Sequence, residues 1–115
     1  MSEAGLDWLY RNATLVVFPT MYEGFGLPMI EAFAHGVPVI ASDIPSLREL
    51  GEGVARFVDP HDSDAWAAAV RELARDAAAR DQMRQSGRAL AAELSYERTA
   101  RATLAVLREA VMVAA

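Results

Sequence analysis

The amino-acid sequence predicts an α/β fold built on a short parallel sheet of about three strands, with helices on both faces and a helical C-terminal part. Three short runs rich in β-branched residues, at residues 15–18, 37–41 and 54–58, alternate with segments in which apolar residues recur at helical spacing. The first run is uninterrupted, which is typical of a strand covered on both faces of a parallel sheet. Helices between consecutive strands predict right-handed crossovers, and therefore parallel strands.

The first element is expected to be a short helix over residues 3–12. Its residues Leu6, Leu9 and Tyr10 are three and four positions apart and therefore share one face. Asn12 or Ala13 would end it, and Trp8 is interpreted as a core residue.

A second helix is expected to follow the glycine-containing segment after the first strand. Pro28 fits its first turn, where a missing N–H costs nothing, and Gly36 fits its C-terminal cap. Four apolar residues are predicted to face the sheet: Met29, Ile30, Phe33 and Ala34. A third, short helix over residues 45–50 would be broken by the glycines after it.

The remainder of the chain is predicted to be helical. Asp62 or Ser63 would cap a helix whose apolar stripe contains Trp66, Val70 and Leu73. A second helix is expected over residues 78–94, with Gly87 as a weak point and three inward residues: Met83, Leu90 and Leu94. Ser95 would cap a last helix over residues 96–113, whose apolar residues recur at spacings of three and four: Ala100, Leu104, Leu107 and Val111.

Composition limits the classes of protein that the chain can represent. A length of 115 residues allows one domain at most, and 53% hydrophobic residues argue against disorder. The net charge of −5, with no basic cluster, makes nucleic acid an unlikely partner. No apolar run is long enough for a membrane span, so a cytoplasmic location is expected. The absence of Cys excludes disulfides and thiolate metal sites, and every basic residue is Arg.

The segment between the first strand and the second helix is the candidate binding site. Gly24 and Gly26 flank Phe25, so the backbone there can approach a ligand closely. The helix that follows directs its unpaired N–H groups and the positive end of its dipole towards this loop, where a phosphate would be held. Glu31 could accept hydrogen bonds from a sugar diol, and Glu23 could reach a second sugar. Ligands of open α/β sheets bind at the carboxyl ends of the strands, where this loop must lie.

The same residues also fit ordinary structural roles that need no ligand. The two glycines are most often plain turn residues, and Glu31 near a helix N-terminus is favourable on dipole grounds alone. Glu23 fits an ordinary solvated charge. His35, beside a helix C-terminus, is expected to cap it, and His61 is expected to be exposed. Two such separated histidines make a weak case for a metal, so no metal site or cofactor is predicted.

Residues 18–43, FPTMYEGFGLPMIEAFAHGVPVIASD, resemble the donor-site signature of GT-B glycosyltransferases of the large retaining, metal-independent group. That signature is a Glu, seven residues and a second Glu, followed by a small-residue helix and a Gly-x-Pro-Val-Ile-Ala strand. Glu23 and Glu31 have this spacing. Later segments are similar to the family too: PSLREL, FVDP, DSDAWAAAV and SYERTA.

The resemblance implies a Rossmann-like, three-layer fold and a role for each matched position. Glu31 would bind the ribose hydroxyls of a nucleotide-sugar donor, and Glu23 would act as the catalytic residue near the anomeric carbon. The helix from Pro28 would offset charge on the leaving diphosphate. The donor sugar and phosphates would be lined by the backbone of Gly24, Phe25, Gly26 and Leu27.

The resemblance also implies that residues 1–115 are the second half of a donor domain. The N-terminal acceptor domain and the first half of the donor domain, with its Arg and Lys clamp, would be absent. The chain alone is therefore expected to be inactive and to bind nucleotide weakly. The alternative is a non-catalytic module that self-associates or binds a partner, and a homodimer through the exposed sheet edge or the C-terminal helix is expected. A sugar epimerase of the same architecture is disfavoured, because the spacing of the two Glu residues around GFGLP is not expected there.

Overall fold

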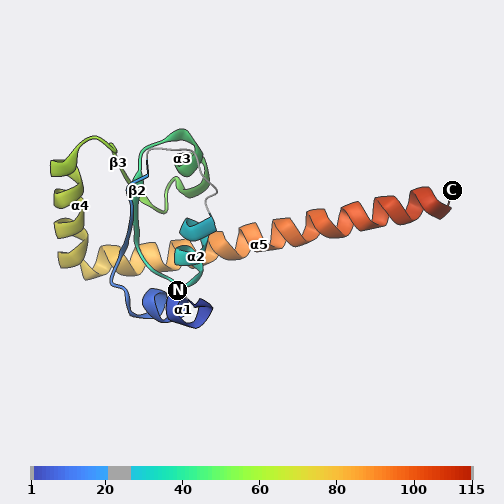
Figure 1. The fold of residues 1–115 in the computed structure, drawn as a ribbon, viewed down its shortest axis with the longest axis horizontal. Helices are drawn as coiled ribbons and strands as arrows, with labels where there is room; N and C mark the ends of the chain where they lie inside the picture. Colours follow the sequence, from blue (N-terminus) through green and yellow to red (C-terminus); the bar gives the residue numbers. More distant parts are fainter. Residues whose placement is uncertain (1, 21–26, 115) are drawn as a thin grey trace.

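The computed structural model describes residues 2–20 and 27–114. Figure 1 shows a small α/β body from which one long helix projects to the C-terminus. Its elements, in chain order, are α1 (Glu3–Asn12), β1 (Val16–Phe18), α2 (Leu27–Ala34), β2 (Val39–Ser42), α3 (Pro45–Gly51), β3 (Arg56–Val58), α4 (Ser63–Arg75) and α5 (Ala77–Ala114).

The three described strands form one parallel sheet, as the sequence predicts, and their order is β1-β2-β3. The register pairs Val17 with Ile40 and Ala41 with Phe57. Every residue of the central strand β2 is buried, whereas β1 forms one edge of the sheet. The predicted strand ends coincide with the observed ones or differ from them by at most two residues.

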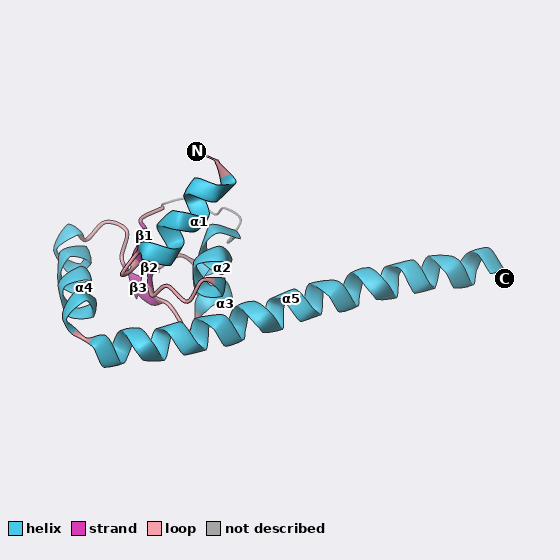
Figure 2. Cartoon of the chain, turned by 90° about the horizontal axis from the view of Figure 1, so that it is seen from below, coloured by secondary structure: helices cyan, strands magenta, loops and turns pink. Residues whose placement is uncertain are grey.

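Helices cover both faces of the sheet, which makes the predicted three layers (Figure 2). Side chains of β2 alternate between two apolar clusters, as the pleat requires. Val39 and Ala41 join the cluster that contains residues of α1, α2, α3 and α5. Ile40 packs on the other face against Ala69 and Leu73 of α4.

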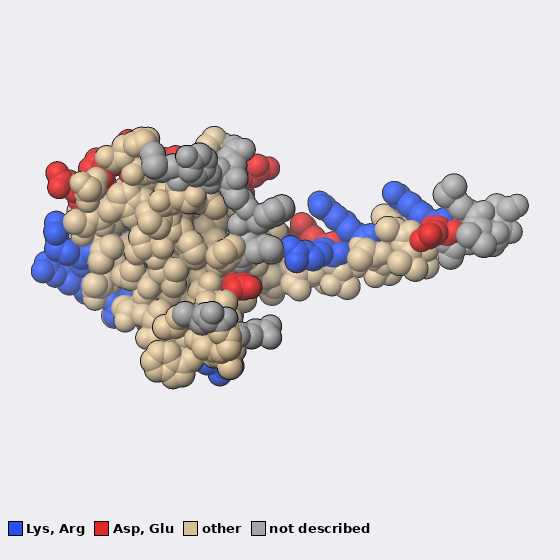
Figure 3. Space-filling view, viewed as in Figure 1, with Lys and Arg blue, Asp and Glu red and all other residues tan. Residues whose placement is uncertain are grey.

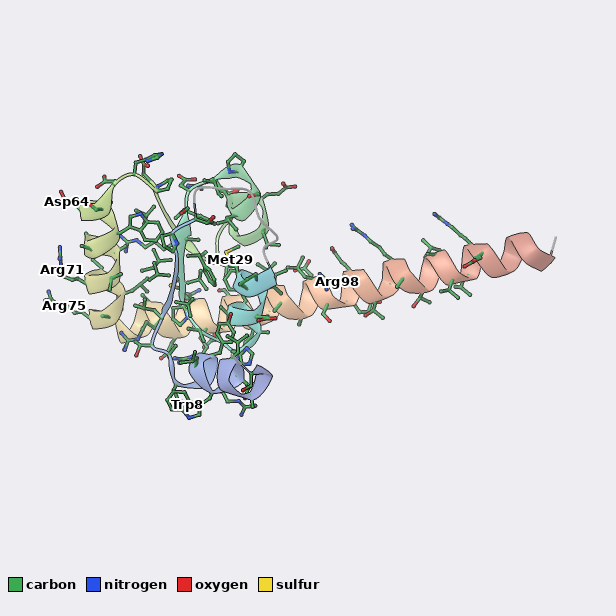
Figure 4. The ribbon with its side chains drawn as sticks, in the orientation of Figure 1. Trp8, Met29, Asp64, Arg71, Arg75 and Arg98 are labelled. Atoms are coloured by element: carbon green, nitrogen blue, oxygen red, sulfur yellow. The ribbon has the colours of Figure 1, made fainter. Side chains whose placement is uncertain are left out.

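Helix α2 turns most of the expected residues inward. Met29 and Phe33 are 1% exposed, and Figure 4 shows Met29 pointing into the body. The expectation that Ala34 faces the sheet is wrong, because Ala34 is exposed and Ala32, completely buried, takes that position. Ala32 and Met29 are three residues apart, so they lie on the same face of the helix.

Helix α1 occupies its predicted residues but buries little of its apolar surface. Tyr10 is buried, whereas Leu6 and Leu9 are partly exposed. The interpretation of Trp8 as a core residue is wrong: its side chain is 62% exposed and points away from the body (Figure 4). Trp8 lies two positions from Tyr10, which places it on the opposite side of the helix.

The two helices predicted over residues 78–94 and 96–113 are a single helix, α5. Asp76 Oδ1 accepts a hydrogen bond from Ala79 N at 2.9 Å and so caps its start. Ser95 is not a cap, because it lies inside the helix and its carbonyl accepts from Thr99 Oγ1. The sequence around Ser95 is rich in Ala, Leu, Arg and Glu, which are strong helix formers, so a lone Ser does not stop the helix.

Only the first part of α5 packs on the body, where it crosses α2 (Figure 1). The part after Leu94 extends into solvent, and the side chains of residues 95–109 are exposed. Its charged groups carry both signs (Figure 3). The predicted apolar spacing is present there, but it covers no other described element.

Candidate functional site

The candidate site starts where α2 begins, after the carboxyl end of β1. The structure describes Pro19 and Thr20 and then the chain from Leu27, the first residue of α2. The predictions for Glu23, Gly24, Phe25 and Gly26 lie outside the described residues, and for Leu27 only the backbone position is described.

The C-terminal end of α2 is fixed by a Schellman motif. Gly36, with φ of +70°, donates from its N–H to the Phe33 carbonyl at 2.9 Å. Val37 N donates to the Ala32 carbonyl at 2.9 Å. Only a residue without Cβ adopts this φ without strain, so Gly36 is the predicted C-terminal cap.

Glu31 lies in the second turn of α2 with an exposed side chain. The first turn of α2 carries no acidic residue. The dipole at this end is therefore not offset by a carboxylate of the first turn, which favours an external anion there.

A groove of about 230 Å³ runs beside Glu31, between α1 and α2. It is lined by Leu6, Asp7, Tyr10, Glu31 and His35. The sequence analysis singled out Glu31 and His35 separately, and the structure brings both to the same groove. The groove lies beside the second turn and the C-terminal end of α2, where polar side chains of both helices can bond the hydroxyl groups of a small ligand.

His35 bonds at both of its ring nitrogens. Nδ1 lies 2.8 Å from the Glu31 carbonyl, and Nε2 lies 3.0 Å from Asp7 Oδ1. The bond to the Glu31 carbonyl, followed by the bond to Asp7, raises the pKa of His35 above its ordinary value of 6.5. The expected capping role agrees with the bond to Glu31, a carbonyl of the last turns of α2.

Tyr10 connects α1 with the first turn of α2. Its hydroxyl donates to the Pro28 carbonyl at 3.3 Å, and its ring stacks on His35 with centroids 4.9 Å apart. Burial, and then the negative charge of Glu31, raise the pKa of the Tyr10 hydroxyl. The hydroxyl therefore stays a hydrogen-bond donor at neutral pH.

Asp7 is the member of this cluster that the sequence analysis missed. Its carboxylate bonds His35 and lies 2.6 Å from Arg11 Nε. The bond from His35 is the largest cause that lowers the pKa of Asp7, with Arg11 contributing further. The spacing of Asp7, Tyr10 and Arg11, three and four residues apart, predicts that they share one face of the helix. The sequence does not predict the contact of Asp7 with His35, because the two residues are 28 positions apart.

The carboxyl end of β2 is occupied by an internal ion pair. Arg48 of α3 donates to both oxygens of Asp43, at 2.7 and 2.9 Å, and its guanidinium lies 4.9 Å from the centre of the Phe57 ring. This arginine is therefore engaged within the protein. Within residues 2–20 and 27–114, no three His, Asp or Glu side chains are grouped to hold a metal ion.

Two further hollows lie away from this groove. One, of about 440 Å³, lies between β3, α4 and the start of α5, and the Arg56–Glu72 ion pair lines it. The other, of about 500 Å³, follows the projecting part of α5. Arg71 and Arg75 of α4 point outward into solvent in Figure 4. None of these features contacts α2.

Fold and site together define an α/β protein with a parallel sheet, in which the helix that follows the edge strand β1 carries an exposed carboxylate in its second turn. The chain belongs to the group 1 glycosyl transferases, because the model of that family, "Glycosyl transferases group 1", matches residues 1–90. None of the described helices has the length and apolar character needed to cross a membrane.

Relatives of known name are similar to most of the chain. O-antigen chain mannosyltransferase B of Escherichia coli is 39% identical over 92 residues, which are 80% of this chain and 24% of the relative. D-inositol 3-phosphate glycosyltransferase of Paenarthrobacter aurescens is 38% identical over 104 residues, 89% of this chain and 26% of the relative. The chain therefore spans about a quarter of the length of these curated relatives.

A solved structure has the same fold. Sucrose-phosphate synthase from Thermosynechococcus elongatus superposes with a TM-score of 0.77 and 31% identity, covering 94% of this chain and 28% of that one. The predicted Rossmann-like GT-B fold and the predicted glycosyltransferase family are thereby confirmed.

Proposed function

We propose that the chain contributes nucleotide-sugar binding to a glycosyltransferase that transfers a sugar from this donor to an acceptor. The observation that carries the proposal is the start of α2 at the carboxyl end of β1 with Glu31 exposed beside it. In open α/β sheets this is the position of the ligand. Family membership supports sugar transfer as the chemistry.

In this proposal, Glu31 accepts hydrogen bonds from the ribose hydroxyls. The first N–H groups of α2 face the diphosphate, and the backbone from Gly24 to Leu27 lines the donor sugar and phosphates. Glu23 lies near the anomeric carbon as positive charge develops there. The dipole of α2 stabilises the charge that grows on the leaving diphosphate.

The stereochemistry and the metal requirement are also proposals. Transfer with retention of the anomeric configuration, without a metal ion or cofactor, follows from the resemblance in residues 18–43. The α2 dipole supports it, because a helix N-terminus can stabilise a diphosphate without a cation. We also propose that the isolated chain is inactive and binds donor weakly. The cytoplasmic location and the lack of a nucleic-acid partner stay predictions.

A titration with UDP, GDP and ADP, each compared with its 2′,3′-dideoxy form, tests the role of Glu31. Loss of one hydrogen bond to a charged carboxylate should weaken binding about tenfold. We therefore expect Glu31→Gln to weaken ribonucleotide binding by that factor, and the dideoxy form to bind both proteins equally. The matched control is Glu109→Gln, on the projecting part of α5, which should bind as the unmodified chain does.

Two results would contradict the proposal. One is the absence of binding by all three nucleotides at millimolar concentration with the chain folded. The other is an equal effect of Glu31→Gln on ribose and dideoxyribose forms, because the carboxylate would then not recognise the hydroxyls.

Self-association is the second candidate function, and the exposed apolar residues of α5 favour it. Tyr96, Val106 and Leu107 are more than half exposed, and β1 leaves one edge of the sheet unpaired among the described strands. Light scattering after chromatography should then show a dimer that Leu107→Glu dissociates, while Ala102→Glu, at an exposed site, does not. A monomer at high concentration would rule the dimer out.

A further inference from the structure

We infer that Tyr10 and His35 are positioning residues, which hold α2 and its Glu31 against α1, and that this hold requires His35 to carry both ring protons. The inference deepens the proposed function and rests on it, because the helix so positioned is the one that would bind the donor. It adds to the matched signature the contacts of Asp7 and Tyr10, which belong to α1 and lie outside residues 18–43.

Two carbonyl groups in the first turns of α2 accept hydrogen bonds from Tyr10 and His35. The Tyr10 hydroxyl bonds the carbonyl of Pro28 in the first turn, and His35 bonds the carbonyl of Glu31 one turn later. These acceptors are three residues apart and lie on the same side of the helix. Tyr10 of α1 bonds α2 directly, and Asp7 of α1 bonds His35, the residue after α2. Helix α1 therefore contributes to where the first turns of α2, and the carboxylate of Glu31, are held.

The two hydrogen-bond partners of His35 indicate how its imidazole is protonated. Both partners of His35, a carbonyl oxygen and the Asp7 carboxylate, are hydrogen-bond acceptors. A neutral imidazole has one N–H and could satisfy only one of them. The doubly protonated ring satisfies both, and its positive charge also lies favourably near the C-terminus of α2.

Charged groups of α1 and α2 face His35 and influence its pKa. Asp7 lies at 3.0 Å and favours the imidazolium, whereas Arg11, paired with the other oxygen of Asp7, disfavours it. Tyr10 stacks on the ring, and the Glu31 carboxylate lines the same groove. The balance raises the pKa of His35.

Two arginines approach from α5. Arg84 Nε donates to the carbonyl of Gly36, the residue after His35, at 3.1 Å. A Cβ built on Gly36 would lie 2.6 Å from Arg88 Nε, so this guanidinium is also adjacent. Both add positive charge near the C-terminus of α2, whereas the bonds to the Glu31 carbonyl and to Asp7 favour the second proton on His35.

The sign of the pH dependence follows from the raised pKa. The bridge from His35 to Asp7 is complete below the ordinary histidine pKa of 6.5. One of the two hydrogen bonds of His35, to the Glu31 carbonyl or to Asp7, is lost as the pH rises through the higher pKa of the folded chain. Donor affinity should therefore decrease on the alkaline side, and Asp7→Asn should move that decrease to lower pH.

The first test needs no nucleotide. Imidazole nitrogen shifts and amide shifts are recorded by NMR from pH 5 to 9. We expect two protonated nitrogens on His35 below pH 6.5, and amides of residues 29–31 that titrate with the same midpoint. In Asp7→Asn that midpoint should fall. Amides of α2 that do not respond while His35 titrates would overturn the inference.

The second test measures the dissociation constant of UDP, GDP or ADP at pH 6 and pH 8.5. The net contribution of a typical intramolecular hydrogen bond corresponds to about a threefold to tenfold change in an equilibrium constant. We expect the unmodified chain to lose that much affinity when the pH rises from 6 to 8.5, in addition to any change in affinity that His35→Gln shows over the same range. The phosphate ionisation of the nucleotide is common to both proteins and cancels in their ratio. His61→Gln, at an exposed histidine, is the control and should keep the full pH dependence.

Tyr10→Phe tests the other contact, because it removes only the hydroxyl. Weaker binding at every pH is expected, whereas Tyr96→Phe, at a 77% exposed tyrosine, should have no effect. Two results together would overturn the inference. One is an unchanged nucleotide affinity in Tyr10→Phe. The other is a ratio of affinities at pH 6 and pH 8.5 that is the same in His35→Gln as in the unmodified chain. If no nucleotide binds at either pH, the proposed function fails, and the shifts of the first test alone decide whether His35 holds α2.

Discussion

Gly87 of α5 lies directly against Phe33 of α2. A Cβ atom built on Gly87 would lie 3.3 Å from Phe33 Cδ1 and 3.4 Å from Phe33 Cα. Both residues are buried, and this crossing joins α5 to the helix of the candidate site. The absence of a side chain at position 87 therefore determines how closely the two helices approach.

Enlarging position 87 should separate these helices. Gly87→Leu is expected to lower the free energy of unfolding by about 1 to 3 kcal/mol, as overpacked cores do. Gly87→Ala should be nearly neutral, because a gain of about 1 kcal/mol in helix propensity offsets the crowding. Denaturant unfolding measures both. Ala92→Leu, at an exposed site of the same helix, is the control, and an equal effect there would contradict the packing argument.

Gly87 also shows what the sequence could predict. Its residue type indicated a weak point in a helix, and it is instead a point of contact, because a contact between residues 33 and 87 depends on tertiary packing. The strands, α1 to α4, the first turn of α2 and its C-terminal cap follow from local signals such as Pro28 and Gly36. The continuity of α5 and the exposure of Trp8 do not, because each depends on what lies beside the helix.

The candidate site divides in the same way. Glu31 could be singled out because it lies at a fixed distance from a helix start and within a family signature. The cluster of Asp7, Tyr10 and His35 could not, since its members come from two helices that meet only in the folded chain. The matched residues Glu23 to Gly26 lie outside the described part and stay predictions.

The two tryptophans should respond differently to the same substitution. Trp66 Nε1 donates to the Asp59 carbonyl at 3.0 Å, and the ring packs against the cluster under α4. Trp66→Phe keeps an aromatic ring but loses that bond, so it should cost about 1 kcal/mol of stability. Trp8→Phe should cost nothing measurable, because Trp8 is 62% exposed. Thermal unfolding of both variants tests this, and equal costs would be inconsistent with the structure.

Removing the projecting part of α5 should leave the body intact. The side chains of residues 95–109 are exposed, so a chain that ends at Ser95 loses no described packing contact. Its free energy of unfolding should lie within about 0.5 kcal/mol of that of the whole chain. Circular dichroism during urea unfolding would measure both. A loss several times larger would show that this part of α5 packs against something in solution.

Acid stability should depend on the pair formed by Asp43 and Arg48. Two hydrogen bonds from Arg48 lower the pKa of Asp43 below its ordinary value of 3.8. A lowered pKa stabilises the folded chain above that ordinary value, and the contribution is lost as the pH falls through the folded pKa.

Asp43→Asn is therefore expected to be less stable than the unmodified chain at pH 6 and to approach it in stability below pH 3.8. Urea unfolding over this range measures the difference. Asp64→Asn, at an exposed carboxylate that points outward from α4 in Figure 4, is the control. A difference for Asp43→Asn that stays constant with pH would argue against the ion pair.

The central claim, that the start of α2 binds the diphosphate and ribose of a donor, is tested most directly by mapping amide shifts during a titration with UDP, GDP and ADP. We expect one nucleotide to shift the amides of residues 27–31 more than those of the rest of the chain, and we expect Glu31→Gln to reduce those shifts. Shifts confined to the α4–α5 hollow or the projecting part of α5, with residues 27–31 unchanged, would contradict it.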